Sequence, residues 1–287
     1  MKKFPLSISN SPLAIIAVAI ISTLLFTACR KDEYETPYMT VTLLKQGVGN
    51  VSFQLSGSGE ITVNWNDGTP PEIFMFSPEG YINNIRHSYS SPPPHVISIT
   101  GDNITRLNCF GMYYVTSLDL SRNTKLTSLW LLSNQLTSLD LSRNTALTIL
   151  NCGSNQLTRL DLSRNTALTY LQCEHNRLTS LDVSRNTALT ELNCDINLLT
   201  SLDVSKNTKL TSLSCGNNQL TNLDVSKNTA LTYLDCGVNN LQVDALNTLF
   251  HSLPVVSSGV IRIGSNPGTE ACDRSIATTK GWRVSNY

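Results

Sequence analysis

Residues 147–167 read LTILNCGSNQLTRLDLSRNTA, and this 21-residue unit decides the fold. Further copies begin at Leu126, Leu168, Leu189, Leu210 and, in part, Leu231. Each copy contains two near-copies of the pattern LxxLxLxxN, ten and eleven residues long. Such a short period is typical of a solenoid, in which each turn buries its apolar face against its neighbours. The sequence therefore predicts a stack of nearly identical coils.

Leucine and asparagine have separate tasks in the unit. In Leu-x-Leu, alternate side chains point the same way, so the leucines are expected to point into the coil. The Asn amide can bond the backbone of its own turn and of the next, which satisfies groups that would otherwise be buried unpaired. We expect one ladder at Asn134, Asn155, Asn176, Asn197, Asn218 and Asn239, and a second at Asn123, Asn144, Asn165, Asn186, Asn207 and Asn228.

LxLxxN is the strand-and-turn signature of leucine-rich repeats, and the nested unit resembles the 21-residue irregular class of bacterial (internalin-like) repeats. The resemblance covers about half of the chain. It implies a mainly β fold: a leucine-rich-repeat solenoid over 102–241 with two opposed parallel sheets and little helix. A small β-sandwich over 38–101 is expected to precede it, and an α/β cap over 242–287 to close it.

Residues 1–28 have the features of an export signal. Lys2 and Lys3 precede an apolar stretch over 13–26, which is short for a membrane span and has the length of a signal-peptide core. The following LFTAC, ending at Cys29, resembles a bacterial lipoprotein cleavage site. The resemblance implies lipidation of Cys29 and a membrane anchor. A soluble secreted protein with a leftover Cys29 is the alternative.

Residues 29–37 are expected to form a linker. Its RKDE run at 30–33 resembles the export tag of Bacteroidetes-type surface lipoproteins, which implies an exposed, lipid-anchored location on the bacterial outer membrane. A solvated charged linker is the alternative.

The segment 38–101 contains alternating strands separated by Gly, Ser and Pro turns. They are expected over 40–43, 51–55, 61–65 and 96–100. WNDG at 65–68, HSY at 87–89 and VISITG at 96–101 resemble the PKD-like immunoglobulin sandwich, although Asn66 replaces its usual small residue. Asp67 is expected to shape its turn, with cation contact as the alternative.

The two ends of the repeat region are expected to be covered. The last sandwich strand runs straight into a degenerate repeat at Ile104, which predicts one continuous core. Beyond Leu241, spacing predicts a helix over 243–253, a strand over 260–263, a helix over 270–280 and a last strand from Trp282. Such a cap covers the open edge of a solenoid, and Cys272 is expected in its core.

Five cysteines occupy one position of successive repeats: Cys152, Cys173, Cys194, Cys215 and Cys236. Leu131 takes that position one repeat earlier, and Cys109 fits it in a degenerate first turn. The pattern predicts an inward ladder of small apolar side chains. Disulfides and a soft-metal site are the alternatives, but side chains stacked in register do not easily reach the S–S torsion, and no CxxC spacing occurs.

The half-repeats differ in how much their copies diverge. One half stays near Leu-Asp-Leu/Val-Ser-Arg/Lys-Asn-Thr, whereas the other keeps its core residues and changes its outward ones. Because outward aromatic rings favour interfaces, we predict that the variable sheet is the binding face. Its candidates are Trp130, Tyr170, Glu174, Glu191, Asp195 and Tyr233. Drift of solvent positions is the alternative.

The constant half carries an aspartate column beside an Arg/Lys column that can neutralise its charge. Calcium binding by the aspartates is the alternative interpretation. The column is Asp119, Asp140, Asp161, Asp182, Asp203 and Asp224.

Composition argues against two functional classes. Lys plus Arg and Asp plus Glu number 21 each, so no basic field favours nucleic acid. His87, His95, His175 and His251 have no triad or ligand spacing, and no phosphate loop, GxSxG or metal motif appears. Cys173 stands near His175 but is expected to point inward. We therefore expect no enzyme, catalytic residue, cofactor or metal.

Two functions remain. The first is a surface binding protein that recognises a protein on a host or neighbouring cell, which the internalin-like resemblance implies by fold analogy. The second is a glycan-binding or envelope-scaffolding lipoprotein, since outward Trp and Tyr also suit sugars. A protein partner should need several turns, whereas a sugar should depend on one or two rings, above all Trp130.

Overall fold

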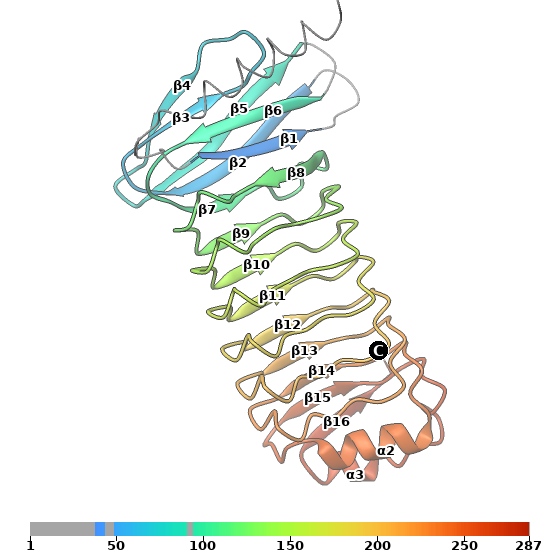
Figure 1. The fold of residues 1–287 in the computed structure, drawn as a ribbon. Coiled ribbons are helices and arrows are strands. Elements are labelled where there is room, and N and C mark those ends of the chain that lie inside the picture. Colours follow the sequence, from blue (N-terminus) through green and yellow to red (C-terminus); the bar gives the residue numbers. More distant parts are fainter. Residues whose placement is uncertain (1–37, 44–48, 91–93, 287) are drawn as a thin grey trace, which may run out of the picture. The chain divides into compact units, whose positions relative to one another are not determined.

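The computed structural model describes residues 38–43, 49–90 and 94–286 (Figure 1). The predicted signal peptide at 1–28, Cys29 and the linker at 29–37 lie outside the described residues. Within the described part, no helix is both long enough and apolar enough to cross a membrane.

A small β-sandwich opens the described chain. One layer is an antiparallel sheet in the order β4-β3-β6-β1-β8, and the other is β5-β2-β7. Trp65, Phe53 and Ile85 are almost completely buried between them. The strands are β1 (Tyr38–Leu43), β2 (Gly49–Gly57), β3 (Glu60–Asn64), β4 (Glu72–Met75), β5 (Tyr81–Tyr89), β6 (His95–Thr100), β7 (Ile104–Asn108) and β8 (Val115–Asp119).

Two sandwich strands are absent from the sequence-based prediction. In β4 all four side chains are exposed or half-buried, so the strand has no clear apolar alternation. In β5 the sequence YINNIRHSY does not alternate between apolar and polar residues. The other predicted strands correspond to β1, β2, β3 and β6.

The sandwich and the solenoid share one core. Strand β7 pairs antiparallel with β2 and parallel with β9 (Ser128–Trp130), while β8 pairs with β1. Ile104, Leu107 and Cys109 belong to the same apolar cluster as the repeat leucines. The expected continuous core is confirmed, and the domain boundary set at residue 101 stays a prediction.

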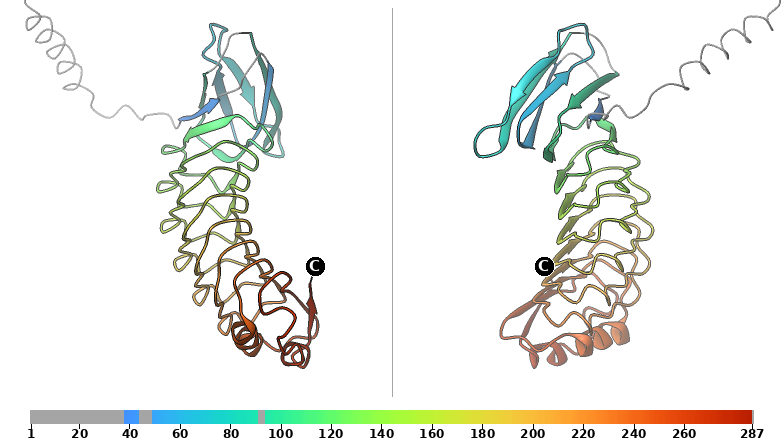
Figure 2. Two further views of the ribbon diagram at one scale, coloured as in Figure 1. Left: turned by 90° about the vertical axis from the view of Figure 1, so that its right-hand side faces the viewer. Right: turned by 60° about the vertical axis from the view of Figure 1, so that its left-hand side comes forward.

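The repeats form a column of coils with a parallel sheet on one side (Figures 1 and 2). Each repeat strand has three residues, and each pairs in register with the residues 21 positions away. The central leucine of every strand is at most 2 % exposed. The mainly β solenoid with its sandwich and cap is therefore confirmed. After β9 the strands are β10 (Ile149–Asn151), β11 (Tyr170–Gln172), β12 (Glu191–Asn193), β13 (Ser212–Ser214) and β14 (Tyr233–Asp235).

The opposite layer of the coils, built by the constant half, is held together in another way. From Leu139 onward its Leu-Asp-Leu/Val segments lie between turns and are not strands, whereas Leu118 and Asp119 of the first copy belong to β8. Asn165, which is fully buried, donates through Nδ2 to the carbonyls of Leu141 at 3.1 Å and Asn144 at 2.9 Å. The same two contacts recur in each later coil. Side chains thus supply the cross-coil bonds of this layer.

The other asparagine ladder uses both ends of its amide. Asn176 Nδ2 donates to the carbonyls of Cys152 and Cys173 at 3.0 and 3.1 Å, and its Oδ1 accepts the Leu157 N–H at 2.9 Å. Asn266 in the cap makes the equivalent bonds to Cys236, Ile263 and Leu241. The expected ladder is confirmed, and it extends one coil beyond the repeat.

The cysteine ladder is buried as predicted. All six side chains have no exposed surface, and none forms a disulfide. Burial raises the pKa of the Cys109 and Cys152 thiols to about 12, so they stay protonated. The members are Cys109, Cys152, Cys173, Cys194, Cys215 and Cys236.

The cap consists of α2 (Val243–Ser252), β15 (Gly259–Arg262), α3 (Ser275–Thr278) and β16 (Trp282–Ser285). Both strands extend the parallel sheet. The helix expected over 270–280 was too long. The helix begins at Ser275, with Arg274 as its N-cap residue and no side-chain cap bond. Before it, Asp273 accepts the N–H and hydroxyl of Ser275, and the Cys272 N–H bonds the Gly268 carbonyl in the preceding turn.

Removing Asn176 should destabilise the solenoid more than removing Asn165. Asn176→Ala leaves the buried Leu157 N–H without its acceptor, whereas Asn165→Ala leaves no donor unpaired, because the Asn165 Oδ1 has no partner among the described residues. The carbonyls that both amides contact keep a second donor, so Asn165→Ala removes hydrogen bonds only. We expect losses in the free energy of unfolding of about 3 and about 1.5 kcal/mol. Urea unfolding measures both, with Thr179→Ala as the exposed control. Equal losses would contradict the assigned roles.

Candidate functional site

The variable half-repeats form one outward surface, here called the variable face and defined by the outward side chains of β9–β14 and of the turn residues that directly follow these strands. Strand pairing continues its central row onto the sandwich and the cap. In pairing order the row is Gln54, Asn108, Trp130, Asn151, Gln172, Asn193, Ser214, Asp235 and Arg262. The face is therefore longer than the repeat region.

All six predicted binding residues lie on this face. Trp130, Tyr170, Glu191 and Tyr233 are strand residues, whereas Glu174 and Asp195 follow β11 and β12. Glu191 is exposed and the other five are half-buried. The structure sorts five of them into an aromatic group, an acidic group and Tyr233 beside the cap.

The aromatic group has its centre at Trp130. Its ring centroid lies 6.0 Å from that of Tyr170, and the Arg106 guanidinium lies 5.4 Å from the Trp130 ring. Trp130 Nε1 donates to Ser128 Oγ at 2.8 Å, which fixes the indole. Arg, Trp and Tyr are the residue types that contribute most to protein interfaces. Arg106 was missed because β7 lies in the degenerate first turn.

The acidic group lies nearer the cap. Glu174 folds over Gly153, where an added Cβ would collide with its carboxylate. Asp195 Oδ1 accepts the Gly216 N–H at 2.6 Å, and Asp235 pairs with Arg262 at 3.5 Å. Burial, followed by the charge of Asp235, raises the pKa of Asp195 to about 7. Burial also raises the pKa of Glu174.

Tyr233 joins this acidic region to the cap. The Arg262 guanidinium lies 5.6 Å from the Tyr233 ring, as Arg106 lies over Trp130 at the other end. An Arg–aromatic pair therefore stands near each end of the variable face. Arg262 was also missed, since it belongs to β15 outside the repeat.

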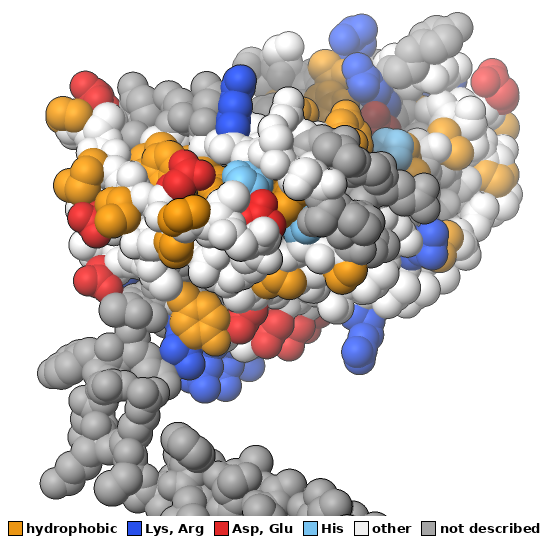
Figure 3. Space-filling view, turned by 90° about the horizontal axis from the view of Figure 1, so that it is seen from above, with side chains coloured by type: hydrophobic (Ala, Val, Ile, Leu, Met, Phe, Trp, Pro, Cys, Tyr) orange, Lys and Arg blue, Asp and Glu red, His pale blue; other side chains and the backbone are white. Residues whose placement is uncertain are grey.

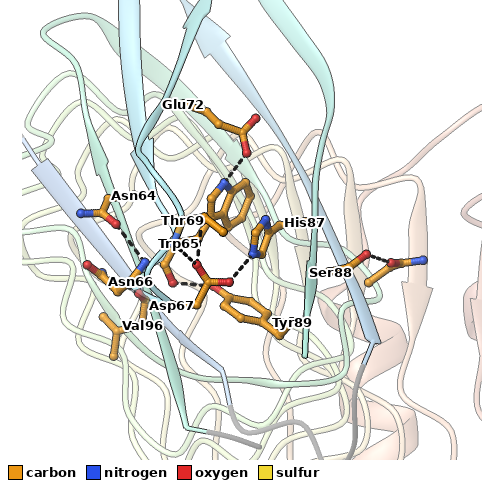
Figure 4. Close-up of polar contacts among 11 residues, drawn as sticks. Asn64, Trp65, Asn66, Asp67, Thr69, Glu72, His87, Ser88, Tyr89 and Val96 are labelled. Carbon is orange, nitrogen blue, oxygen red and sulfur yellow. Dashed lines mark hydrogen bonds and ion pairs between the residues drawn. The ribbon is translucent and has the colours of Figure 1, made fainter. Parts of the chain in front are cut away.

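The WNDG and HSY motifs form one packed cluster in the sandwich (Figure 4). His87 stacks on Trp65 with ring centroids 4.4 Å apart, and its Nε2 lies 2.7 Å from Asp67 Oδ2. Asp67 Oδ1 accepts the N–H and hydroxyl of Thr69, and these bonds, followed by that to His87, hold the Asp67 pKa well below its usual value. The Tyr89 hydroxyl donates to the Trp65 carbonyl at 3.0 Å. Asp67 thus shapes its turn, as expected.

The aspartate column of the constant half binds its own turns. Asp161 Oδ1 accepts the Ser163 N–H at 2.9 Å, and the same contact recurs in neighbouring coils. These bonds lower the pKa of Asp161. Among the described residues, no three His, Cys, Asp or Glu side chains are grouped to hold a metal ion.

The Cys173 and His175 pair, which the sequence places close together, does not form a reactive site. Cys173 is fully buried while His175 is exposed, so this pair does not meet at the surface. Viewed from the sandwich end, apolar side chains are scattered among polar atoms and charges of both signs (Figure 3).

Comparison with known proteins identifies the fold. No protein-family model matches the chain, and no curated protein matches it. Internalin C2 of Listeria monocytogenes is 23 % identical, with a TM-score of 0.53, covering 63 % of this chain and 81 % of that one. The fold is that of the leucine-rich-repeat solenoids.

Two further solved structures are similar in part. The functional domain of InlJ from Listeria monocytogenes, described as including a cysteine ladder, is 31 % identical, with a TM-score of 0.39. It covers 65 % of this chain, which spans 56 % of that one. A leucine-rich-repeat protein of Leptospira interrogans is 21 % identical, with a TM-score of 0.47, covering 57 % and 50 % of the two chains.

The raised pKa of Asp195 predicts a pH-dependent stability. Because the folded protein holds this proton up to about pH 7 and the unfolded chain loses it near 3.8, stability falls as pH rises between these values. Asp195→Asn keeps an acceptor for Gly216 and should raise the melting temperature at pH 8 but not at pH 3.5. Glu191→Gln, on the exposed part of the same face, is the control. An unchanged pH profile in Asp195→Asn would refute the assignment.

Proposed function

We propose that the chain is a non-catalytic cell-surface binding protein that recognises a protein on a host or neighbouring cell through the variable face. The single observation that carries the proposal is the contrast between the two sides of each coil. One side repeats its outward residues, while the other varies them and collects Arg106, Trp130 and Tyr170.

The size and chemistry of the face suit a protein partner. Three-residue strands from six coils lie side by side and continue into β7 and β15, which offers a surface several turns long. The aromatic and acidic groups lie at different places along it, so one ligand would need complementary apolar and basic areas. The half-buried rings are already held in place, which lowers the entropy cost of binding.

The internalin-like neighbours support a binding role at the level of fold.

The resemblance of residues 25–29 to a lipoprotein cleavage site supports a surface location. Lipidated Cys29 would anchor the chain to the bacterial outer membrane, and a PKD-like sandwich would precede the repeats in the chain. Incorporation of labelled palmitate in the wild type, and its loss in Cys29→Ala, tests this anchor. Equal labelling of both would reject it.

A glycan-binding or envelope-scaffolding lipoprotein is the alternative function. The observation in its favour is the fixed Trp130 ring, since a flat indole can stack on a sugar. Loss of all binding in Trp130→Ala alone, with Tyr170→Ala and Asp195→Asn unaffected, would favour it.

The protein-binding proposal is tested by screening the chain against host-cell and bacterial surface proteins, followed by calorimetry on variants. Trp130→Ala combined with Tyr170→Ala should weaken a genuine hit about 30-fold or more, corresponding to about 2 kcal/mol for the removal of interface hot spots. Arg106→Ala should weaken it less.

The matched control is Arg164→Ala, a truncation on the constant side, which should leave the dissociation constant unchanged. Binding that survives all variable-face changes but falls in Arg164→Ala would place the interface on the opposite side of the coils and overturn the proposal.

A further inference from the structure

A cavity of about 380 Å³ lies where the sandwich meets the first coil, outside the predicted binding residues. One wall is the outward side of β2, with Asn50, Ser52 and Gln54. The other wall is the loop over 108–114 that follows β7. This volume is within the range of small-ligand sites.

The loop departs from the repeat in a specific way. From Cys109 to Val115 is six positions, whereas the same step from Leu131 to Leu136 is five, so the first coil carries one extra residue. The backbone N–H of Tyr113 bonds the Ser133 carbonyl. One coil later, the backbone N–H of Asn134 bonds the Ser154 carbonyl in the same way. Tyr113 therefore stands where later coils have their ladder asparagine.

The departure places two aromatic rings at the surface. Phe110 and Tyr113 are each 61 % exposed, and Tyr113 has a φ of 59°, in the left-handed region that an aromatic residue rarely adopts. Asn134 makes the usual bonds of a ladder asparagine to the preceding coil, to the Cys109 carbonyl and the Val115 N–H, so the first coil keeps its cross-coil bonds without Asn at 113.

The loop is held rigidly by the next coil. The Gly111 N–H bonds the Leu132 carbonyl at 3.0 Å, and Gln135 Nε2 donates to the Tyr113 carbonyl at 2.7 Å. Asn108 bridges the two walls, because its Nδ2 donates to Gln54 Oε1 at 3.0 Å and its Oδ1 accepts the Phe110 N–H at 3.0 Å. The site is therefore formed before a ligand arrives.

The chemistry of the lining is neutral and amide-rich. Among the residues that the structure describes, no charged side chain lines the cavity, which disfavours phosphates, carboxylates and cations. Within the described residues, Asn50 Nδ2 and Gln54 Nε2 donate no hydrogen bond, so both donors are available. Amides beside exposed rings match a ligand with many hydroxyls and apolar C–H faces.

We propose that this cavity binds one sugar residue of a neutral glycan. The amides of Asn50, Gln54 and Asn108 bond its hydroxyls, and Phe110 or Tyr113 covers one face of its ring. The site does not use Trp130 or Tyr170, so it stands whether or not the variable face binds a protein.

Saturation-transfer NMR on the full chain tests the proposal, with methyl glycosides of glucose, galactose, mannose and N-acetylglucosamine at millimolar concentration as probes. At least one glycoside should show transfer. The variants Gln54→Ala, Phe110→Leu and Tyr113→Asn should each weaken its binding tenfold or more. The last two restore the residues that the next coil carries, and all three change exposed side chains, so folding should be preserved; circular dichroism checks this.

Val255→Ala, at an exposed apolar side chain in the cap and far from the cavity in the sequence, is the control and should bind as the wild type does. Absence of transfer from every neutral glycoside, or binding lost in Trp130→Ala and kept in the three cavity variants, would overturn the assignment.

Discussion

The structure depends on the asparagine side chains that satisfy the backbone at its turns. A coil of 21 residues must bury peptide groups at each corner, where no strand partner exists, and an unpaired buried group costs about 1–3 kcal/mol. The ladder through Asn176 pairs these groups, because each amide bonds the backbone of both its own coil and the preceding one. Coil spacing and register follow from that reach.

A frame held by asparagine, leucine and cysteine leaves the outward positions free. The constant side still uses its aspartates to stabilise turns, which explains why those residues recur. On the variable side only some outward residues stabilise turns in this way, as Asn151 and Asn193 do, so the other outward positions can vary with a ligand. Arg106 with Trp130 near the sandwich and Arg262 with Tyr233 near the cap give this side its recognisable chemistry.

Much of the fold could be predicted because a period of 21 repeats every physical constraint several times. The inward leucines, both ladders and the buried cysteines all follow from it. The prediction was weakest where nothing repeats. Strand β4 lacks apolar alternation, and α3 begins only at Ser275, whereas the spacing predicted a helix from residue 270.

The prediction of the site was limited in the same way, because only residues inside the repeats could be compared with one another. Trp130 and Tyr170 could be identified because aligned repeats showed which positions vary. Arg106, Arg262 and the cavity beside Tyr113 depend on which strands lie next to one another across sandwich, solenoid and cap. The extra residue between Cys109 and Val115 was visible in the sequence, but only the structure shows that this longer loop places aromatic rings on a wall opposite Gln54.

The reach of each ladder asparagine has an evolutionary consequence. Every rung bonds its own coil and the coil before it, never one farther away, so deleting or duplicating a whole 21-residue unit joins identical surfaces. Recombination within the gene can therefore lengthen or shorten the variable face without redesign of the core, while the two ends, each made once, stay fixed.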